Sequence, residues 1–171
     1  MEKTIAAALY VLNKVQGKSL DRHKLFKILY KADQKHLSKY GRTITNDTYI
    51  AMDYGPVPSR LYDIIRSDNQ YTATTYTDNG SSKIPIEKPL IETDLDRLSK
   101  TDIDLLDIAI KENITKSFAR LTSETHGYAY EHTALNSPMD IFNIAKEGEA
   151  GTEIIEYIQE HLEIDNIVNY A

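Results

Sequence analysis

The 171-residue sequence contains no cysteine and no tryptophan, and it has few prolines and glycines (5 and 7). Without cysteine the chain can form neither a disulfide framework nor a thiolate metal site, and it has no cysteine nucleophile. No apolar run is long enough to span a membrane, and the first one ends at Leu12, too early for a good signal peptide. We therefore expect a cytoplasmic protein with no membrane partner.

Charge is divided unevenly along the chain, which carries a net charge of −6. Residues 1–60 hold 11 Lys and Arg against 5 acidic residues, whereas residues 61–171 hold 9 against 21. Such asymmetry can reflect a nucleic-acid face, a charged protein partner or two halves of the chain that complement each other. Composition alone leaves these three possibilities open.

The length and the periodicity of apolar residues predict one domain, residues 1–171, of the α+β class and mainly helical. About seven helices are expected, with a small antiparallel sheet or hairpin in the middle. The helices are placed at 4–15, 21–40, 59–66, 101–111, 114–124, 139–145 and 149–167, the strands at 48–54, 71–77 and 83–87, and a loop or short turn at 127–138. Asp78-Asn79-Gly80 is a strong hairpin turn signal, and Pro85 favours an edge position for the second arm.

The helix expected at 21–40 has the clearest pattern, a broad apolar face into which Asp33 and His36 point. These two residues are three apart, so they can form a hydrogen bond with each other on a helix. A catalytic interpretation is an oriented general base that needs a nucleophile. No nucleophile motif lies nearby in the sequence, so we predict that Asp33 and His36 are a buried structural pair.

The opposite face of this helix carries a lysine stripe, which consists of Lys24, Lys27, Lys31, Lys35 and Lys39. One interpretation is a surface that follows a nucleic-acid backbone. The stripe has only Arg42 at its end to read base edges, and the chain as a whole is acidic. We therefore predict a solvated or protein-docking face, and nucleic acid is not an expected partner.

Other candidate sites are weaker. His126 and His132, with Glu124 and Glu131 close by, could contribute metal ligands, but their spacing matches neither common zinc motif and a site needs three or four ligands. In Gly55-Pro56-Val57-Pro58 the two prolines remove the backbone donors that a phosphate site needs, which predicts a rigid strand-to-helix corner. No catalytic residue, metal or cofactor is predicted, and a hydrolase built on Asp33 and His36 or on His126 and His132 is the weakest hypothesis.

A longer motif string is specific to a known family. It runs through 24–33 (KLFKILYKAD), His36-Leu37, Tyr40-Gly41-Arg42, 44–49 (ITNDTY), 51–59 (AMDYGPVPS) and Leu61-Tyr62-Asp63. Over residues 24–63 this string resembles the Panacea domain, also called the SocA-like antitoxin domain, and is similar to phage-associated proteins that carry it. The motif positions to which we assign structural parts are Asp33, His36, Tyr40, Gly41, Tyr49, Gly55, Pro56, Val57, Pro58, Leu61 and Tyr62.

The resemblance implies an antitoxin, a non-catalytic protein that binds and neutralises a toxin encoded beside it. One branch of the family resembles an adaptor that delivers its toxin to an AAA+ protease, which is one alternative. The other alternative is a nucleic-acid-binding or regulatory protein that uses the Lys24–Lys39 stripe.

The acidic C-terminal helix offers a candidate surface for the toxin. Glu153, Glu156, Glu160 and Glu163 are aligned at helical spacing. A toxin that contacts RNA or nucleotides would usually be basic, so we expect these glutamates to bind the partner. The alternative is a solvated face without a partner.

Overall fold

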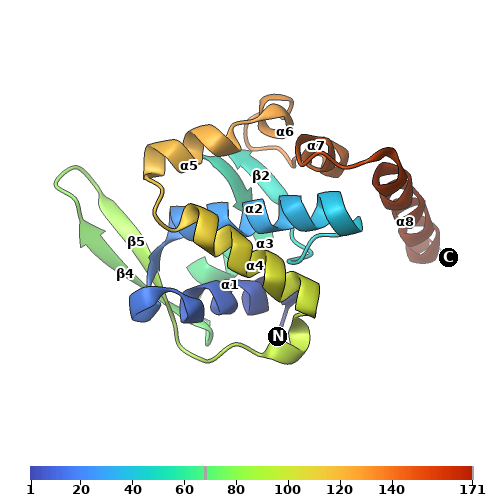
Figure 1. Ribbon diagram of the computed structural model, residues 1–171. Coiled ribbons are helices and arrows are strands. Elements are labelled where there is room, and N and C mark those ends of the chain that lie inside the picture. Colours follow the sequence, from blue (N-terminus) through green and yellow to red (C-terminus); the bar gives the residue numbers. More distant parts are fainter. Residues whose placement is uncertain (68, 171) are drawn as a thin grey trace.

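The computed structural model describes residues 1–67 and 69–170, with side chains to residue 164. This part of the chain forms eight α-helices and two small antiparallel sheets, which confirms the expected mainly helical α+β class (Figure 1). The helices are α1 (Lys3–Lys14), α2 (Arg22–Tyr40), α3 (Ser59–Arg66), α4 (Lys100–Asn113), α5 (Phe118–Thr125), α6 (Tyr128–Glu131), α7 (Ile141–Glu147) and α8 (Thr152–Tyr170), with 3₁₀ turns η1 (Gln16–Lys18) and η2 (Leu95–Arg97). The single turn α6 lies where a loop or short turn was expected.

The strands are β1 (Leu20–Asp21), β2 (Tyr49–Met52), β3 (Gly55–Pro58), β4 (Thr72–Asp78) and β5 (Lys83–Pro89). One sheet has the order β1-β5-β4 and the other pairs β2 with β3. The predicted hairpin is confirmed, but its second arm, β5, is the middle strand, because β1 pairs with Ile86 and Glu87. Pro85 lies just beyond the end of β1, on the part of β5 that keeps a free edge.

Helix α2 lies at the centre of the molecule, between α1, α4, α5 and α7 (Figure 1). The Asp21 carboxylate accepts a hydrogen bond from the Lys24 amide (2.8 Å) and begins the helix. Gly41 ends it in a left-handed conformation with φ of 71°, as the sequence predicts. The first half of α2 packs in one apolar cluster with α1 and α4, and its second half packs in another with β2, α7 and α8.

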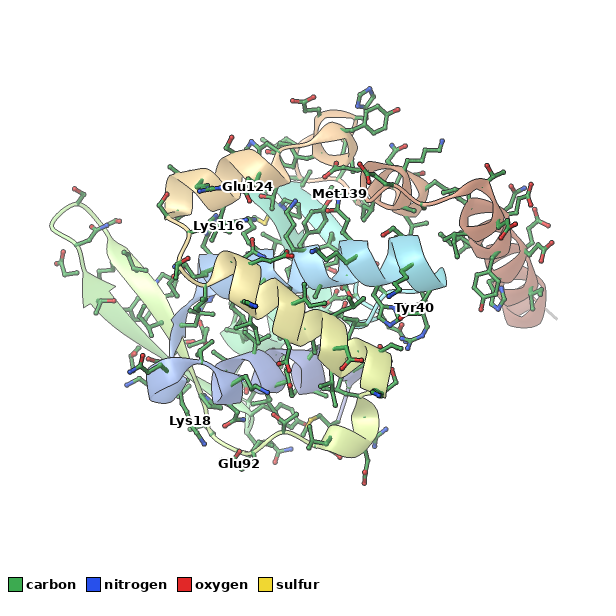
Figure 2. The ribbon with its side chains drawn as sticks, viewed as in Figure 1. Lys18, Tyr40, Glu92, Lys116, Glu124 and Met139 are labelled. Atoms are coloured by element: carbon green, nitrogen blue, oxygen red, sulfur yellow. The ribbon has the colours of Figure 1, made fainter. Side chains whose placement is uncertain are left out.

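Most of the lysine stripe is covered by other elements of the chain, so the prediction of a solvated face is wrong for Lys24, Lys27 and Lys31. Lys24 Nζ donates to the carbonyl oxygen of Ile114 at the end of α4 (2.9 Å), and Lys31 Nζ donates to that of Glu124 in the last turn of α5 (2.9 Å). Carbonyls at a helix C-terminus lack partners within the helix and carry partial negative charge. The Glu124 carboxylate pairs with Lys116 of the connection between α4 and α5 (2.5 Å; Figure 2).

The other lysines of the stripe differ from one another. Lys35 forms a partly exposed ion pair with Glu112 of α4 (2.7 Å), and Lys39 Nζ lies 5.3 Å from the centre of the Tyr40 ring. Lys27 is buried, with 1% of its surface exposed. Periodicity shows which residues share a helix face, but α4 and α5, which cover this face, come from distant parts of the sequence.

Asp102 of α4 forms a buried charged junction between α1, α2 and α4. Its carboxylate accepts hydrogen bonds from Lys3 and Arg42 (both 2.9 Å), lies 3.1 Å from His36 Nε2, and closes a capping box with Ser99. Burial acts to raise the pKa of Asp102, but the hydrogen bonds from Lys3 and the Ser99 amide, with the nearby positive charges, lower it overall. The predicted pairing of His36 with Asp33 is therefore wrong, because His36 contacts this junction.

Asp33 binds the segment that follows α2. Its buried carboxylate accepts hydrogen bonds from the Ile44 amide (2.6 Å), the Thr45 amide and hydroxyl (3.1 and 2.5 Å) and the Tyr49 hydroxyl (2.7 Å). These bonds hold the chain between α2 and β2 against the helix. These bonds support the structural role predicted for Asp33, although its partners are Ile44, Thr45 and Tyr49 and not the predicted His36.

Asp33 makes stability depend on pH. Burial raises the pKa of Asp33 to about 6, although hydrogen bonds from Thr45 and Tyr49 act to lower it. The folded state therefore binds this proton more tightly than the unfolded state, so the contribution of Asp33 to stability falls as the pH rises from about 4 to about 6. We expect Asp33→Asn to remove this dependence, and Asp33→Ala to lower the free energy of unfolding by about 3 kcal/mol because its donors lose their acceptor.

Urea denaturation of the wild type and both variants at pH 4, 5, 6 and 7 tests this expectation. The difference in the free energy of unfolding between the wild type and Asp33→Asn isolates the effect of this carboxyl from that of other titrating groups. If this difference in unfolding free energy is the same at all four pH values, the expected pH dependence of the Asp33 contribution is contradicted.

Candidate functional site

A groove of about 1000 Å³ lies between the β4–β5 hairpin and the body of the protein. Its other walls are the first turns of α2, the turn between β2 and β3, and the start of α5. Figure 1 shows the hairpin extending away from the helices at this end of the molecule. The groove is at the upper end of the size range of ligand pockets, so it can hold several residues of a peptide.

Aromatic rings form the rim and inner wall of the groove. The Phe118 ring stacks on His23 with 4.0 Å between ring centres, and Tyr54 meets Phe118 edge-on at 5.3 Å. Tyr54 is 62% exposed and Phe118 is 49% exposed. Deeper in the groove, Phe26 and Tyr62 meet edge-on at 6.2 Å. Neighbouring exposed rings on a concave surface are typical of a site that binds another molecule.

Lys27 is the charged residue of the groove floor. Its Nζ donates to the carbonyl oxygen of Pro56 (2.8 Å), and no ion pair with Lys27 is found among the described residues. Burial lowers the pKa of Lys27 to about 7. Asp21 and Asp53 also line the groove, but neither forms an ion pair with Lys27, so in the described part of the chain this buried ammonium has no carboxylate bound to it.

Gly55 makes room for Lys27. Its φ of 98° is a conformation that residues with a side chain rarely adopt. A Cβ atom at this position would lie 2.8 Å from Thr125 Oγ1 and 3.0 Å from Lys27 Nζ. The segment Gly55–Pro58 is the strand β3, paired with β2, and not the predicted corner, because the tight turn is made by Asp53 and Tyr54. The following helix, α3, has the predicted bounds.

Two histidines lie near Lys27. Burial, with a further contribution from the charge of Lys27, lowers the pKa of His23 to about 4 and also lowers the pKa of His126. His23 Nε2 lies 3.1 Å from Thr122 Oγ1, and the His126 ring stacks on Tyr130. His23 Nδ1 and His126 Nε2 are buried without a hydrogen-bond partner among the described residues. Both shifts favour the neutral rings, so Lys27, with a pKa of about 7, is the group among these three that carries positive charge near neutral pH.

The histidines considered as metal ligands take separate environments. His126 stacks on Tyr130, whereas His132 packs on Tyr128 and its Nδ1 lies 2.9 Å from the carbonyl oxygen of that residue. Among the side chains that the structure describes, no group of three or more His, Asp or Glu is arranged to hold a metal ion.

The acidic residues of α8 lie on an exposed face. The side chains of Glu153, Glu156, Glu160 and Glu163 are all exposed, whereas Ile158 of the same helix is buried against the second apolar cluster. The Tyr157 ring packs directly on Gly41, where a Cβ atom would overlap it. Gly41 is therefore required both to end α2 and to let α8 approach.

The predicted motif residues have different locations. Val57 and Tyr62 line the groove together with Gly55, and Pro56 supplies the acceptor for Lys27. Leu61 and Tyr49 are buried, Pro58 ends β3 and immediately precedes α3, and Tyr40 packs near His36. Sequence reasoning placed Lys27 in the lysine stripe and not in a groove, and it assigned no role to His23 and Phe118. The one sequence signal for the burial of Lys27 was its place between the apolar residues Phe26 and Ile28.

An open groove with exposed rings and a buried cation is characteristic of a binding protein. Residues 25–130 match the family described as Antitoxin SocA-like, Panacea domain. This match covers more than half of the chain, so the protein belongs to this family of antitoxin-like domains. No curated protein and no solved structure matches the chain. Among the described residues, no helix has the length and apolar character needed to cross a membrane.

The lowered pKa of Lys27 predicts that stability depends on pH. Its pKa is about 7 in the folded protein and near 10.5 when solvated, so the unfolded state binds more protons between these values. The wild type should therefore gain stability as the pH rises from about 7 to about 10, and Lys27→Met should lack this gain. Urea denaturation at pH 7, 8 and 9 measures it, with Lys35→Met as a control that keeps the gain. Parallel pH curves for the wild type and Lys27→Met would refute the expectation.

Proposed function

We propose that this protein is an antitoxin that neutralises a toxin encoded beside its gene by direct, non-catalytic protein–protein contact in the cytoplasm. The family match over residues 25–130 carries the proposal. The matched segment runs from within the first turn of α2 through most of α6 and includes most of the residues that line the groove, whereas Asp21, Arg22, His23 and Lys24 precede it. The exposed rings of that groove support a function in binding.

The contacts of the polar residues weaken the alternatives. Asp33 and His36 are engaged with different partners, so the proposed catalytic pair is not assembled. The lysine stripe contacts α4 and α5, so it does not offer a continuous surface to nucleic acid. Delivery of the toxin to an AAA+ protease stays a prediction from the family resemblance, and no feature of the described residues favours it.

Co-expression tests the proposed function. The neighbouring open reading frame is induced with and without this protein, and growth is scored. Growth arrest that this protein relieves, together with co-purification of the two chains, is the expected result. Relief without co-purification would contradict neutralisation by direct contact. Continued arrest with folded protein present would refute the antitoxin function itself.

We further propose that the four exposed glutamates of α8 attract the toxin. They form a single-sign surface, and complementary charge mainly accelerates association and sets specificity. A basic toxin would approach this surface at long range. This contribution is screened by salt, so it can be separated from short-range contacts.

Charge reversal tests the α8 surface. Replacing Glu153, Glu156, Glu160 and Glu163 with Lys should lower the association rate with the co-encoded toxin about tenfold at low salt and far less at high salt. A matched control reverses four exposed acids elsewhere on the chain, namely Asp63, Asp96, Asp104 and Glu131. This control changes the net charge equally but spreads the change over the molecule. An unchanged rate for the α8 variant at low salt would remove this surface from the interface.

A further inference from the structure

Lys27 differs from the neighbouring lysines of α2 in two ways: it is buried (1% exposed), and its acceptor, the Pro56 carbonyl, lies in a strand and not at a helix C-terminus. Lys24 and Lys31 bind carbonyls at helix C-termini, and Lys35 pairs with a carboxylate. The Lys27 ammonium has three N–H donors, and only the bond to Pro56 is found among the described residues. A buried charge without a counter-charge is costly, and proteins usually pair it. The missing charge can be supplied by a ligand.

The surroundings of Lys27 make it selective for an anion. Arg22, which also lines the groove, is already paired with Glu87 of β5 (2.7 Å). The Asp21 carboxylate is occupied as the N-terminal cap of α2. Phe26, Val57 and Tyr62 give the wall an apolar character. A carboxylate that enters such a low-dielectric site interacts with Lys27 more strongly than it would in water.

The shape of the groove favours an extended peptide. Asp21 of β1 pairs with Ile86 of β5, and the chain then turns away into α2. Residues 83–85 of β5 therefore have no strand beside them on that side, and they line the groove. An extended segment can occupy the place that a longer β1 would have taken. Pro85 removes one backbone donor from this edge, so side-chain contacts must supply much of the affinity.

We propose that the groove binds an extended segment of the toxin, and that an Asp or Glu side chain of this segment pairs with Lys27 while its neighbours pack on Tyr54 and Phe118. This inference rests on the proposed antitoxin function. It is compatible with a basic toxin, because it requires one acidic side chain in one segment. The α8 glutamates would then act at long range and the groove at short range.

Two pairs of variants test the groove. Lys27→Met removes the charge but keeps an unbranched apolar side chain, and Lys35→Met, two turns further along α2, is its control. Tyr54→Ala removes a rim ring that is 62% exposed, and Tyr76→Ala removes a 63% exposed tyrosine of β4 outside the groove. The Tyr54 and Tyr76 side chains are equally exposed, so neither change should affect folding.

The measurement is the Kd of each variant for the toxin encoded by the neighbouring gene. Lys27→Met should weaken binding by about 30-fold or more, and Tyr54→Ala by about tenfold, because each removes a contact that is buried in the complex. Both controls should bind as the wild type does. Unchanged binding by folded Lys27→Met and Tyr54→Ala would overturn the inference and leave the antitoxin function intact. A wild type that does not bind the toxin would overturn both.

The ammonium of Lys27 gives an independent readout in the wild-type protein. Its pKa can be followed by NMR of the labelled lysine side chain, free and with the toxin bound. A partner carboxylate should raise the pKa from about 7, because it stabilises the charged form. This measurement remains available if Lys27→Met fails to fold. A pKa that does not rise on binding would overturn the pairing with an acidic side chain.

Discussion

Burial of α2 on all sides is the constraint on which the rest of the structure depends. A polar side chain that is removed from water must find a partner, because an unpaired one costs several kcal/mol. Helix α2 carries lysines, Asp33 and His36. Lys24 and Lys31 bind helix-terminal carbonyls, Asp33 accepts four hydrogen bonds and His36 lies against Asp102. The buried Lys27, in contrast, binds only the Pro56 carbonyl among the described residues. The bonds of Lys24 and Lys31 attach α4 and α5, and Asp33 attaches the chain that leads to β2. Polar residues of one helix thereby position much of the fold.

The same constraint connects the fold to the proposed function. Lys27 is held beside Gly55 in an apolar groove, where a positive charge is unfavourable until an anion balances it. Burying the Lys27 ammonium costs desolvation energy that no carboxylate among the described residues offsets. A partner carboxylate would offset this cost and so gain binding free energy. Exposed rings at Tyr54 and Phe118 are likewise unfavourable in the free protein and favourable in a complex. Both features limit the stability of the isolated chain and favour binding.

Local sequence signals predicted the elements well because their causes are local. Asp21 and Gly41 set the ends of α2 through backbone hydrogen bonding and a left-handed conformation, and both depend on residues a few positions away. The turn at Asp78-Asn79-Gly80 likewise predicted the β4–β5 hairpin. The start of α5 was placed four residues too early, because its cap, Ser117, follows a short connection that continues the apolar pattern.

The sequence by itself determined the family, the class of fold and most helix boundaries, since these follow from a motif string and from short-range periodicity. Only the tertiary structure decided which polar residues meet. His36 contacts Asp102, and Lys24 contacts Ile114, 90 residues further along the chain. Helical periodicity places residues on a face, but the partner on that face comes from whichever distant segment packs there. The groove at Lys27 is a product of that packing, and no local pattern encodes it.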